Sequence, residues 1–311
     1  MKTFILFLVL GTLLGAHERT QVHMGTLISV RVDDENLSDK VFDLFRDLDQ
    51  RLSTYKSDSE ISRLNRNEDI NVSALIREVL ARSVEMNRLT HGAFDVTIGS
   101  LSHGAYHFGA KERLPTSAEI NHALTFVGED HLKIDHDRVH VTPGTIIDLG
   151  GIGKGFAVDK SIELLMQHGI TKAVIAASGD IGCLGECEVK ITDPFHPNAF
   201  IATVTSSLSR FAISTSGNYE RYIRNKKHNH LLDPKTGKSE QRFASVTLMG
   251  EGDNTALDAL STAVAVMDEK EGMALLKSIS GVYYYLVHND GRVVQSKNLK
   301  NWMGVCFSRG H

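Results

Sequence analysis

Four glycines lie within the eight residues Asp148-Leu-Gly-Gly-Ile-Gly-Lys-Gly155, and this stretch constrains most strongly what the chain can build. Apolar residues before it predict a strand over 139–149, and the pattern after it predicts a helix over 155–168. The glycines therefore form a strand-to-helix turn. Such a turn lets the backbone approach a ligand closely, and the free N–H groups at the helix start suit a phosphate. The alternative is a tight connection in which Asp148 only caps the local backbone.

Two common nucleotide-binding motifs do not fit this turn. The Rossmann fingerprint requires a glycine at the position of Phe156. A P-loop requires a Lys-Ser or Lys-Thr pair where Phe156-Ala157 stands. The stretch therefore belongs to neither motif.

The rest of the chain predicts a mixed α and β fold. Strands are expected over 22–32, 172–177 and 244–249, with a hairpin over 282–295 about Asn289-Asp-Gly291. Helices are expected over 37–52, behind a Ser38 cap, and over 73–89, 255–267 and 270–279. Because no linker, repeat or low-complexity tract interrupts the chain, residues 20–311 are expected to form one compact domain.

Composition and charge limit the classes of partner. Hydrophobic residues make up 41% and charged residues 23%, which is typical of an ordinary globular protein. A net charge of −4 without a long basic run argues against nucleic-acid binding, so small molecules or proteins are the expected partners. Three cysteines, Cys183, Cys187 and Cys306, leave one disulfide open in an oxidising compartment. Their spacing does not select the pair, and it does not fit a zinc site.

The N-terminus has the pattern of an export signal. Met1-Lys2 precedes an apolar run from Phe4 to Ala16, with small residues at its end. We therefore expect residues 1–16 to be a signal peptide. A buried first strand or helix is the alternative, and the run is short for a membrane span.

A group of oxygen-bearing side chains is expected on the predicted helix over 255–267. Asp258, Ser261 and Thr262 have i, i+3 and i+4 spacing, which places them on one helical face. Such hard oxygen ligands suit Mg²⁺, which completes its shell with water and substrate phosphates. The alternative is a capping box, in which Asp258 only satisfies N–H groups of its own helix together with Thr255.

Two polar segments complete the candidate site. Residues 213–217, Ile-Ser-Thr-Ser-Gly, are expected to form a hydroxyl-rich turn. Residues 230–237 are expected to end a short strand in an Asp-Pro-x-x-Gly turn. His230 and Asp233 could form an acid/base element there, although a lone histidine is more often structural.

Seven motifs in this order resemble the ApbE family of FAD:protein FMN transferases. They are Met24-Gly-Thr26, Ser53-Thr-Tyr55 with Ser59-Glu-Ile-Ser62, Gly92-Ala-Phe-Asp95, Asp148 to Gly155, 213–217, His230-Leu-Leu-Asp233-Pro-x-Thr-Gly237, and Asp258-x-x-Ser-Thr262. The resemblance implies an α+β fold, a single T-fold-like domain with mixed or antiparallel sheets and flanking helices. It also implies Mg²⁺-dependent transfer of FMN from FAD to a Thr or Ser hydroxyl of a flavoprotein, through a phosphoester, with release of AMP. Many members are exported, which agrees with the signal and implies a periplasmic location.

When the functional residues of the family are matched to this sequence position by position, the resemblance implies roles for individual residues. His230 would be the base that deprotonates the acceptor hydroxyl, and Asp258 would be essential for catalysis. The Gly151 carbonyl, Asp258 and Thr262 would hold Mg²⁺, with Ser261 standing where some relatives carry a further carboxylate. The residues expected to contact FAD are Met24, Tyr55, Ala93, Phe94, Asp95, Asp148, Lys154 and Leu232.

The same residues are compatible with other activities. An FAD pyrophosphatase would use water in place of the acceptor hydroxyl. A non-catalytic flavin-binding protein would not need Asp258, Thr262 and His230. For a transferase, the resemblance implies as acceptor a flavin-carrying subunit of a membrane electron-transfer complex or an FMN-binding domain of a reductase, and allows association at the membrane side.

Overall fold

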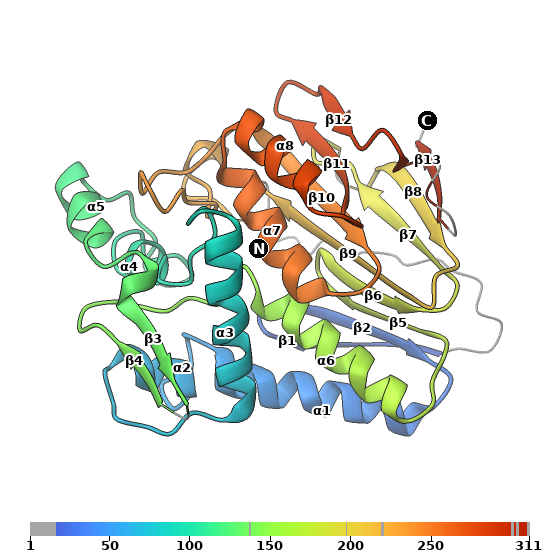
Figure 1. Ribbon diagram of the computed structural model, residues 1–311, viewed down its shortest axis with the longest axis horizontal. Helices are drawn as coiled ribbons and strands as arrows, with labels where there is room; N and C mark the ends of the chain where they lie inside the picture. The colour runs from blue at the N-terminus through green and yellow to red at the C-terminus, as the bar shows by residue number, and fades with distance from the viewer. Residues whose placement is uncertain are drawn as a thin grey trace.

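The computed structural model describes residues 17–136, 138–196, 198–218, 221–299, 302 and 305–309. Its centre is one large sheet in the strand order β1-β2-β5-β6-β9-β10-β11-β12, and all neighbouring strands are antiparallel (Figure 1). The expected signal over 1–16 lies outside the described residues. The strands are β1 (His17–His23), β2 (Thr26–Val32), β5 (Ala173–Ala177), β6 (Asp180–Leu184), β9 (Arg210–Gly217), β10 (Phe243–Gly250), β11 (Tyr283–His288) and β12 (Val293–Gln295).

Each face of the large sheet is buried by a different layer. Helices cover one face, where Val30, Ile175 and Val246 belong to the main hydrophobic core. The alternate residues, such as Val174 and Ile181, pack on the other face against a three-stranded sheet. This sheet has the order β13-β8-β7, from β7 (Cys187–Thr192), β8 (Phe200–Ser206) and β13 (Val305–Arg309). The period-2 alternation of strand side chains thus produces three layers.

The helices and a small hairpin complete the domain. The helices are α1 (Glu35–Leu52), α2 (Glu60–Asn65), α3 (Ala74–Leu89), α4 (Gly99–Ser102), α5 (Ser117–Leu124), α6 (Gly153–Gln167), α7 (Asn254–Val266) and α8 (Glu269–Ser278), with 3-10 turns at Glu129–His131 and Lys226–His228. Strands β3 (Leu132–Asp135) and β4 (Arg138–Val141) form the hairpin. Among the described residues, no helix has the length and apolar character needed to cross a membrane. The predicted α+β class with antiparallel sheets is confirmed.

Two strand predictions were wrong because local turns interrupt them. The expected strand over 22–32 is a hairpin, in which Met24 and Gly25 have φ of 50° and 72° and join β1 to β2. Alternation continues through so tight a turn, so periodicity does not show it. The expected strand over 139–149 ends at Val141, because Pro143 and Gly144, whose φ is 95°, break it.

Three smaller expectations were also wrong. Asp34, not Ser38, caps α1. Residues 213–217 form part of β9 and not a turn, because β6 and β10 hydrogen-bond to it on both sides. The segment before Asp233 contains isolated bridges and no strand.

Candidate active site

The candidate site is built where α6 and α7 cross. The Asp258 carboxylate on α7 accepts a hydrogen bond of 3.0 Å from the backbone N–H of Gly155, in the first turn of α6. A Cβ atom at Gly155 would lie 2.3 Å from the Asn254 carbonyl oxygen and 2.8 Å from the Asp258 Cβ. The helix begins at Gly153, two residues earlier than predicted. Gly155 therefore serves the close approach of the two helices.

A lysine ammonium lies between two buried carboxylates at this crossing. Lys154 Nζ is 3.0 Å from Asp180 Oδ2 and 3.4 Å from Asp258 Oδ2. The Asp180 side chain is only 2% exposed, and Ser214 Oγ donates to its other oxygen at 2.6 Å. Burial and the negative charge of Asp258 raise the pKa of Asp180 to about 7, against the opposing effect of Lys154. The ammonium thus stabilises a carboxylate pair that would otherwise repel.

Asp180 was missed in the sequence analysis. It opens β6 after a turn at Ser178-Gly179, where Ser178 has φ of 58°. The dipeptide Ser-Gly before an apolar run is a sequence pattern that indicates a turn between two strands. It does not indicate that the residue after the turn would contact Lys154.

Hydroxyl groups surround the α7 side of the site. Ser216 Oγ on β9 lies 2.7 Å from Ser261 Oγ and 3.3 Å from Thr262 Oγ1. Ser261 Oγ also donates to the Asp258 carbonyl at 3.0 Å. The prediction that Asp258, Ser261 and Thr262 share one helical face is consistent with this convergence. Because residues 213–217 belong to strand β9 and do not form the predicted turn, Ser216 lies beside these hydroxyl groups.

The residues present fit a hard divalent cation such as Mg²⁺. A Cβ atom at Gly151 would lie 3.1 Å from Thr262 Oγ1, so the glycine backbone and this hydroxyl are close neighbours. Together with Asp258 they offer a carbonyl, a hydroxyl and a carboxylate, which are oxygen ligands of the kind Mg²⁺ takes with water and phosphate. The described residues contain no group of three or more His, Cys, Asp or Glu side chains that could hold a metal. A hard-oxygen site with few protein ligands is thus the kind of metal site that fits.

The capping-box alternative for Asp258 is wrong. The side chain of Asp253 accepts from Ala256 N and caps α7, whereas Asp258 bonds to α6. A second carboxylate, Asp159 on α6, holds the start of α7 from outside. It accepts from Asn254 N at 3.0 Å and from Thr255 N at 2.7 Å. Asp159 was not predicted, and it fixes the helix that carries Asp258.

Asp148 forms a second polar cluster at the glycine turn. Its Oδ2 accepts from Ser102 Oγ at 2.7 Å and lies 3.1 Å from His103 Nε2, while its Oδ1 accepts from Gly150 N at 2.9 Å. Burial alone would lower the pKa of His103, but the ion pair with Asp148 raises it. Against the effect of burial, these partners hold the pKa of Asp148 well below its usual range. Asp148 thus caps the local backbone of the turn, as the alternative interpretation of this stretch predicted. It also carries a fixed negative charge.

The remaining predicted flavin contacts lie in different environments. Tyr55 is 55% exposed, and its ring packs edge-on against His103 at 5.3 Å. Ala93 and Phe94 are buried, and Phe94 would lie 3.3 Å from a Cβ at Gly151. A Cβ at Gly153 would lie 3.6 Å from the Met24 methyl group. These contacts place Met24 and Phe94 against the glycine turn.

Asp95 and Leu232 have structural partners. The Asp95 carboxylate accepts from Thr97 Oγ1 at 2.5 Å and from Asn87 Nδ2 at 3.0 Å, and burial raises its pKa. The Leu232 side chain is buried in a separate hydrophobic cluster with Leu101 and Ile223. A flavin contact by either residue would therefore come from its backbone.

His230 lies beside Arg221. Its Nδ1 is 3.3 Å from the Arg221 carbonyl oxygen, and its backbone N–H donates to the same oxygen at 3.2 Å. Burial and the Arg221 charge lower the pKa of His230 to about 4, so the imidazole is neutral at pH 7. The Asp233 carboxylate accepts from Lys235 N and Thr236 Oγ1 within its own turn. The predicted pairing of His230 with Asp233 is therefore wrong.

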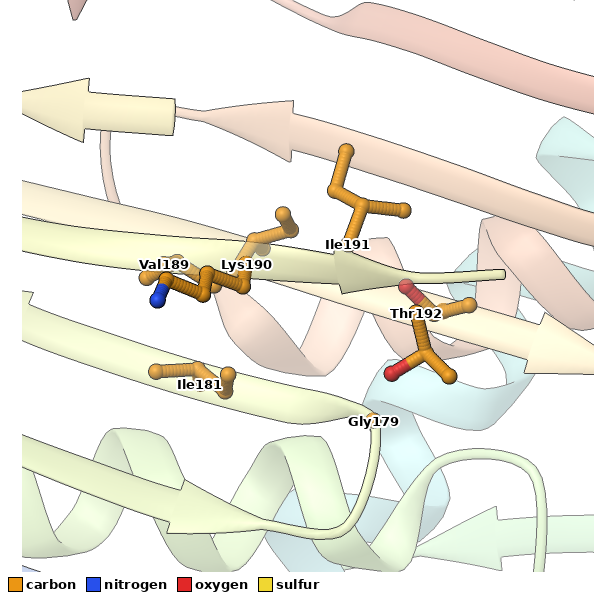
Figure 2. A pocket seen from close by; sticks show the side chains of 8 residues that line it. Gly179, Ile181, Val189, Lys190, Ile191 and Thr192 are labelled. Carbon is orange, nitrogen blue, oxygen red and sulfur yellow. The ribbon is translucent and has the colours of Figure 1, made fainter. Parts of the chain in front are cut away.

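One pocket lies away from this cluster, between β6, β7 and β9 (Figure 2). Its lining includes Ile181 and Val189, together with Ile213 and Thr215 from the predicted polar segment 213–217, and none of the residues predicted to bind FAD or metal or to act in catalysis. Its volume of about 10 Å³ has room for roughly one water molecule. It is too small for a flavin.

Comparison of the sequence with known proteins identifies one family that this chain resembles. A model of the ApbE family matches residues 24–286. An FAD:protein FMN transferase of Vibrio cholerae is 30% identical over 308 residues, covering 89% of this chain and 91% of the relative. One of Haemophilus influenzae is 29% identical, covering 86% and 82%.

Solved structures agree with the sequence comparisons. The crystal structure of the ApbE protein of Thermotoga maritima superimposes with a TM-score of 0.83 at 27% identity, covering 92% of this chain and 99% of that one. The flavin transferase ApbE of Vibrio cholerae gives 0.79 at 27% identity, covering 93% and 99%.

Proposed function

Because this chain belongs to the ApbE family, we propose that it is a flavin transferase that moves FMN from FAD to a protein hydroxyl. One observation carries the proposal, which is the convergence of Lys154, Asp258 and Thr262 beside Gly151. A site that only bound flavin would not need a buried carboxylate and a cation at its centre. We propose a Thr or Ser of a flavoprotein as the acceptor.

The chain's own groups can carry the transfer. Bound Mg²⁺, held by Asp258, Thr262 and the Gly151 carbonyl, would neutralise charge on the pyrophosphate. Lys154 supplies a second positive charge, and the backbone of the glycine turn orients the phosphates. Asp180 and Asp258 hold the Lys154 ammonium in place.

The proton of the acceptor goes to His230. The acceptor oxygen bonds to the phosphorus of the FMN half, the phosphorus–oxygen bond to AMP breaks, and AMP leaves. His230 can accept the proton because its imidazole is neutral at pH 7. The bond formed is a phosphoester.

Purified protein incubated with FAD and Mg²⁺, with and without an FMN-binding domain of a reductase, tests the proposal. We expect AMP release that depends on the acceptor, and a fluorescent acceptor band after denaturing electrophoresis. AMP and free FMN in equal amounts with and without acceptor would instead identify an FAD pyrophosphatase. Asp258→Asn, which keeps an acceptor for the Gly155 N–H, should abolish AMP release while flavin binding persists.

We further propose that the protein is exported, with residues 1–16 as the signal, and acts in the periplasm. The apolar run from Phe4 to Ala16 behind Lys2 supports this. Fractionation of cells and N-terminal sequencing of the protein test it. An intact Met1 on protein found only in the cytoplasm would contradict it.

A further inference from the structure

A strongly basic surface segment borders His230. Residues 221–240, which we call the basic loop, contain six Lys or Arg and two Asp or Glu, whereas the whole chain has a net charge of −4. All six cations are exposed, and within the described part of the chain none of them forms an ion pair. They are Arg221, Arg224, Lys226, Lys227, Lys235 and Lys238.

The basic loop is held in one shape by buried anchors. Asn229 is fully buried, and its side-chain amide donates to the Lys226 carbonyl at 3.0 Å and to the Glu240 carbonyl at 2.8 Å. Ile223 and Leu232 pack into the same hydrophobic cluster as Leu101. The cations are therefore presented on a preorganised frame, which reduces the entropy that binding would cost.

The loop lies beside the place where an acceptor hydroxyl must arrive. The Arg221 carbonyl holds His230 through its backbone N–H at 3.2 Å. The charge of Arg221 reaches into the site, because it adds to burial in lowering the pKa of His230 and opposes the upward shift that burial gives the pKa of Tyr55. A protein that brings a hydroxyl to His230 therefore passes close to the loop.

FAD alone does not account for this charge. Its pyrophosphate carries about two negative charges, which Lys154 and Arg221 together with a divalent cation can balance. Lys226 and Lys227 lie in a 3-10 turn further along the loop, and both are exposed. Their positive charge remains for a second, larger anionic partner.

We propose that the basic loop docks an acidic surface of the acceptor flavoprotein and so brings its hydroxyl to His230. This inference rests on the proposed function, since only a transferase needs a protein acceptor. Opposite charges on two partners increase the rate of encounter and favour one orientation, and salt weakens both effects. Buried uncharged residues of the basic loop, such as Asn229, would hold its cationic side chains in position.

Charge reversal in the loop tests the proposal. The variant is Lys226→Glu/Lys227→Glu, and the control is Lys133→Glu/Lys172→Glu, which changes the net charge equally at two exposed lysines outside the loop. The substrate is a reductase FMN-binding domain of net negative charge, with FAD and Mg²⁺. For the loop variant we expect the acceptor KM to rise about 10-fold or more, with kcat at saturating acceptor and the KM for FAD unchanged. The wild type and the control should lose acceptor kcat/KM steeply with added salt, and the loop variant should lose little.

Each other outcome overturns the inference in a distinguishable way. An equal acceptor KM in the loop variant and the control means that the loop does not dock the acceptor. A change confined to the KM for FAD assigns the cations to the flavin. If vesicles of anionic phospholipid bind the wild type but not the loop variant, and the acceptor KM is unchanged, the partner is a membrane. Absence of acceptor flavinylation by the wild type overturns the proposed function itself.

Discussion

The backbone N–H of Gly155 donates a hydrogen bond of 3.0 Å to the carboxylate of Asp258, which joins the start of α6 to α7. The contact places a candidate metal-binding carboxylate directly against the glycine turn. It depends on the absence of a side chain at Gly155, since a Cβ there would overlap the Asn254 carbonyl oxygen.

Gly155→Ala should therefore destabilise the protein, because the added methyl group forces α6 and α7 apart. We expect the free energy of unfolding to fall by about 1–3 kcal/mol, with loss of AMP release. Gly153→Ala is the matched control, because its Cβ would meet nothing closer than the Met24 methyl group at 3.6 Å. Chemical denaturation of both variants measures the difference. Equal stability would show that the helix contact can adjust.

Lys154→Met should leave Asp180 and Asp258 buried without their cation. At pH 8 we expect a loss of about 3–5 kcal/mol in the free energy of unfolding. The loss should be smaller at pH 5.5, because the pKa of Asp180 is about 7 and its carboxyl is then protonated in the folded protein. Lys160→Met, on the same helix, breaks ion pairs with the exposed Glu78 and Glu163 and should cost about 1 kcal/mol or less. Similar losses for both variants at pH 8 would contradict the role given to Lys154.

The fall of kcat/KM on the acidic side of the pH profile should reflect protonation of His230. With this residue as the base, kcat/KM should show a fall near pH 4, because the pKa of His230 is about 4 in the folded protein, and this fall is separate from any change near pH 7 that protonation of Asp180 causes. Arg221→Met should move this fall upward toward the ordinary histidine range near 6.5, since it removes a positive charge that disfavours protonation. Initial rates of acceptor flavinylation between pH 4 and 8 measure both. A fall near pH 4 that Arg221→Met leaves unmoved would argue against His230 as the base.

Reduction should destabilise the protein through one disulfide. The structure joins Cys183 and Cys187 across the β6–β7 turn and leaves Cys306 free and exposed, which settles the pairing that spacing left open. Closing so short a loop is worth about 2 kcal/mol in the chain-entropy model. Denaturation with and without dithiothreitol measures the effect, and Cys183→Ala/Cys187→Ala should show none. Without reductant, thiol alkylation followed by mass spectrometry should label Cys306 alone.

Sequence by itself determined the elements whose signals are local. The helices α1 and α3 and the turn at Asn289-Asp-Gly291 depend on neighbours within a few residues, and the structure has them where they were expected to within two residues. The ordered motifs likewise identified the family, because each is a short stretch of chain. Local signals failed where turns were compact, as at Met24-Gly25, or where flanking strands overrode a turn-like composition, as in β9.

Only the tertiary structure decided which side chains meet. Asp180, Lys154 and Asp258 come from β6, α6 and α7, and no spacing along the chain relates them. The same holds for Asp159, which accepts from a backbone N–H at the start of α7 although it lies on another helix, and for His230, whose partner is the Arg221 carbonyl and not Asp233. A charge or hydrogen-bond partner is selected by the packing of whole elements, since electrostatic and hydrogen-bond energies depend on distance in space and not on separation in sequence.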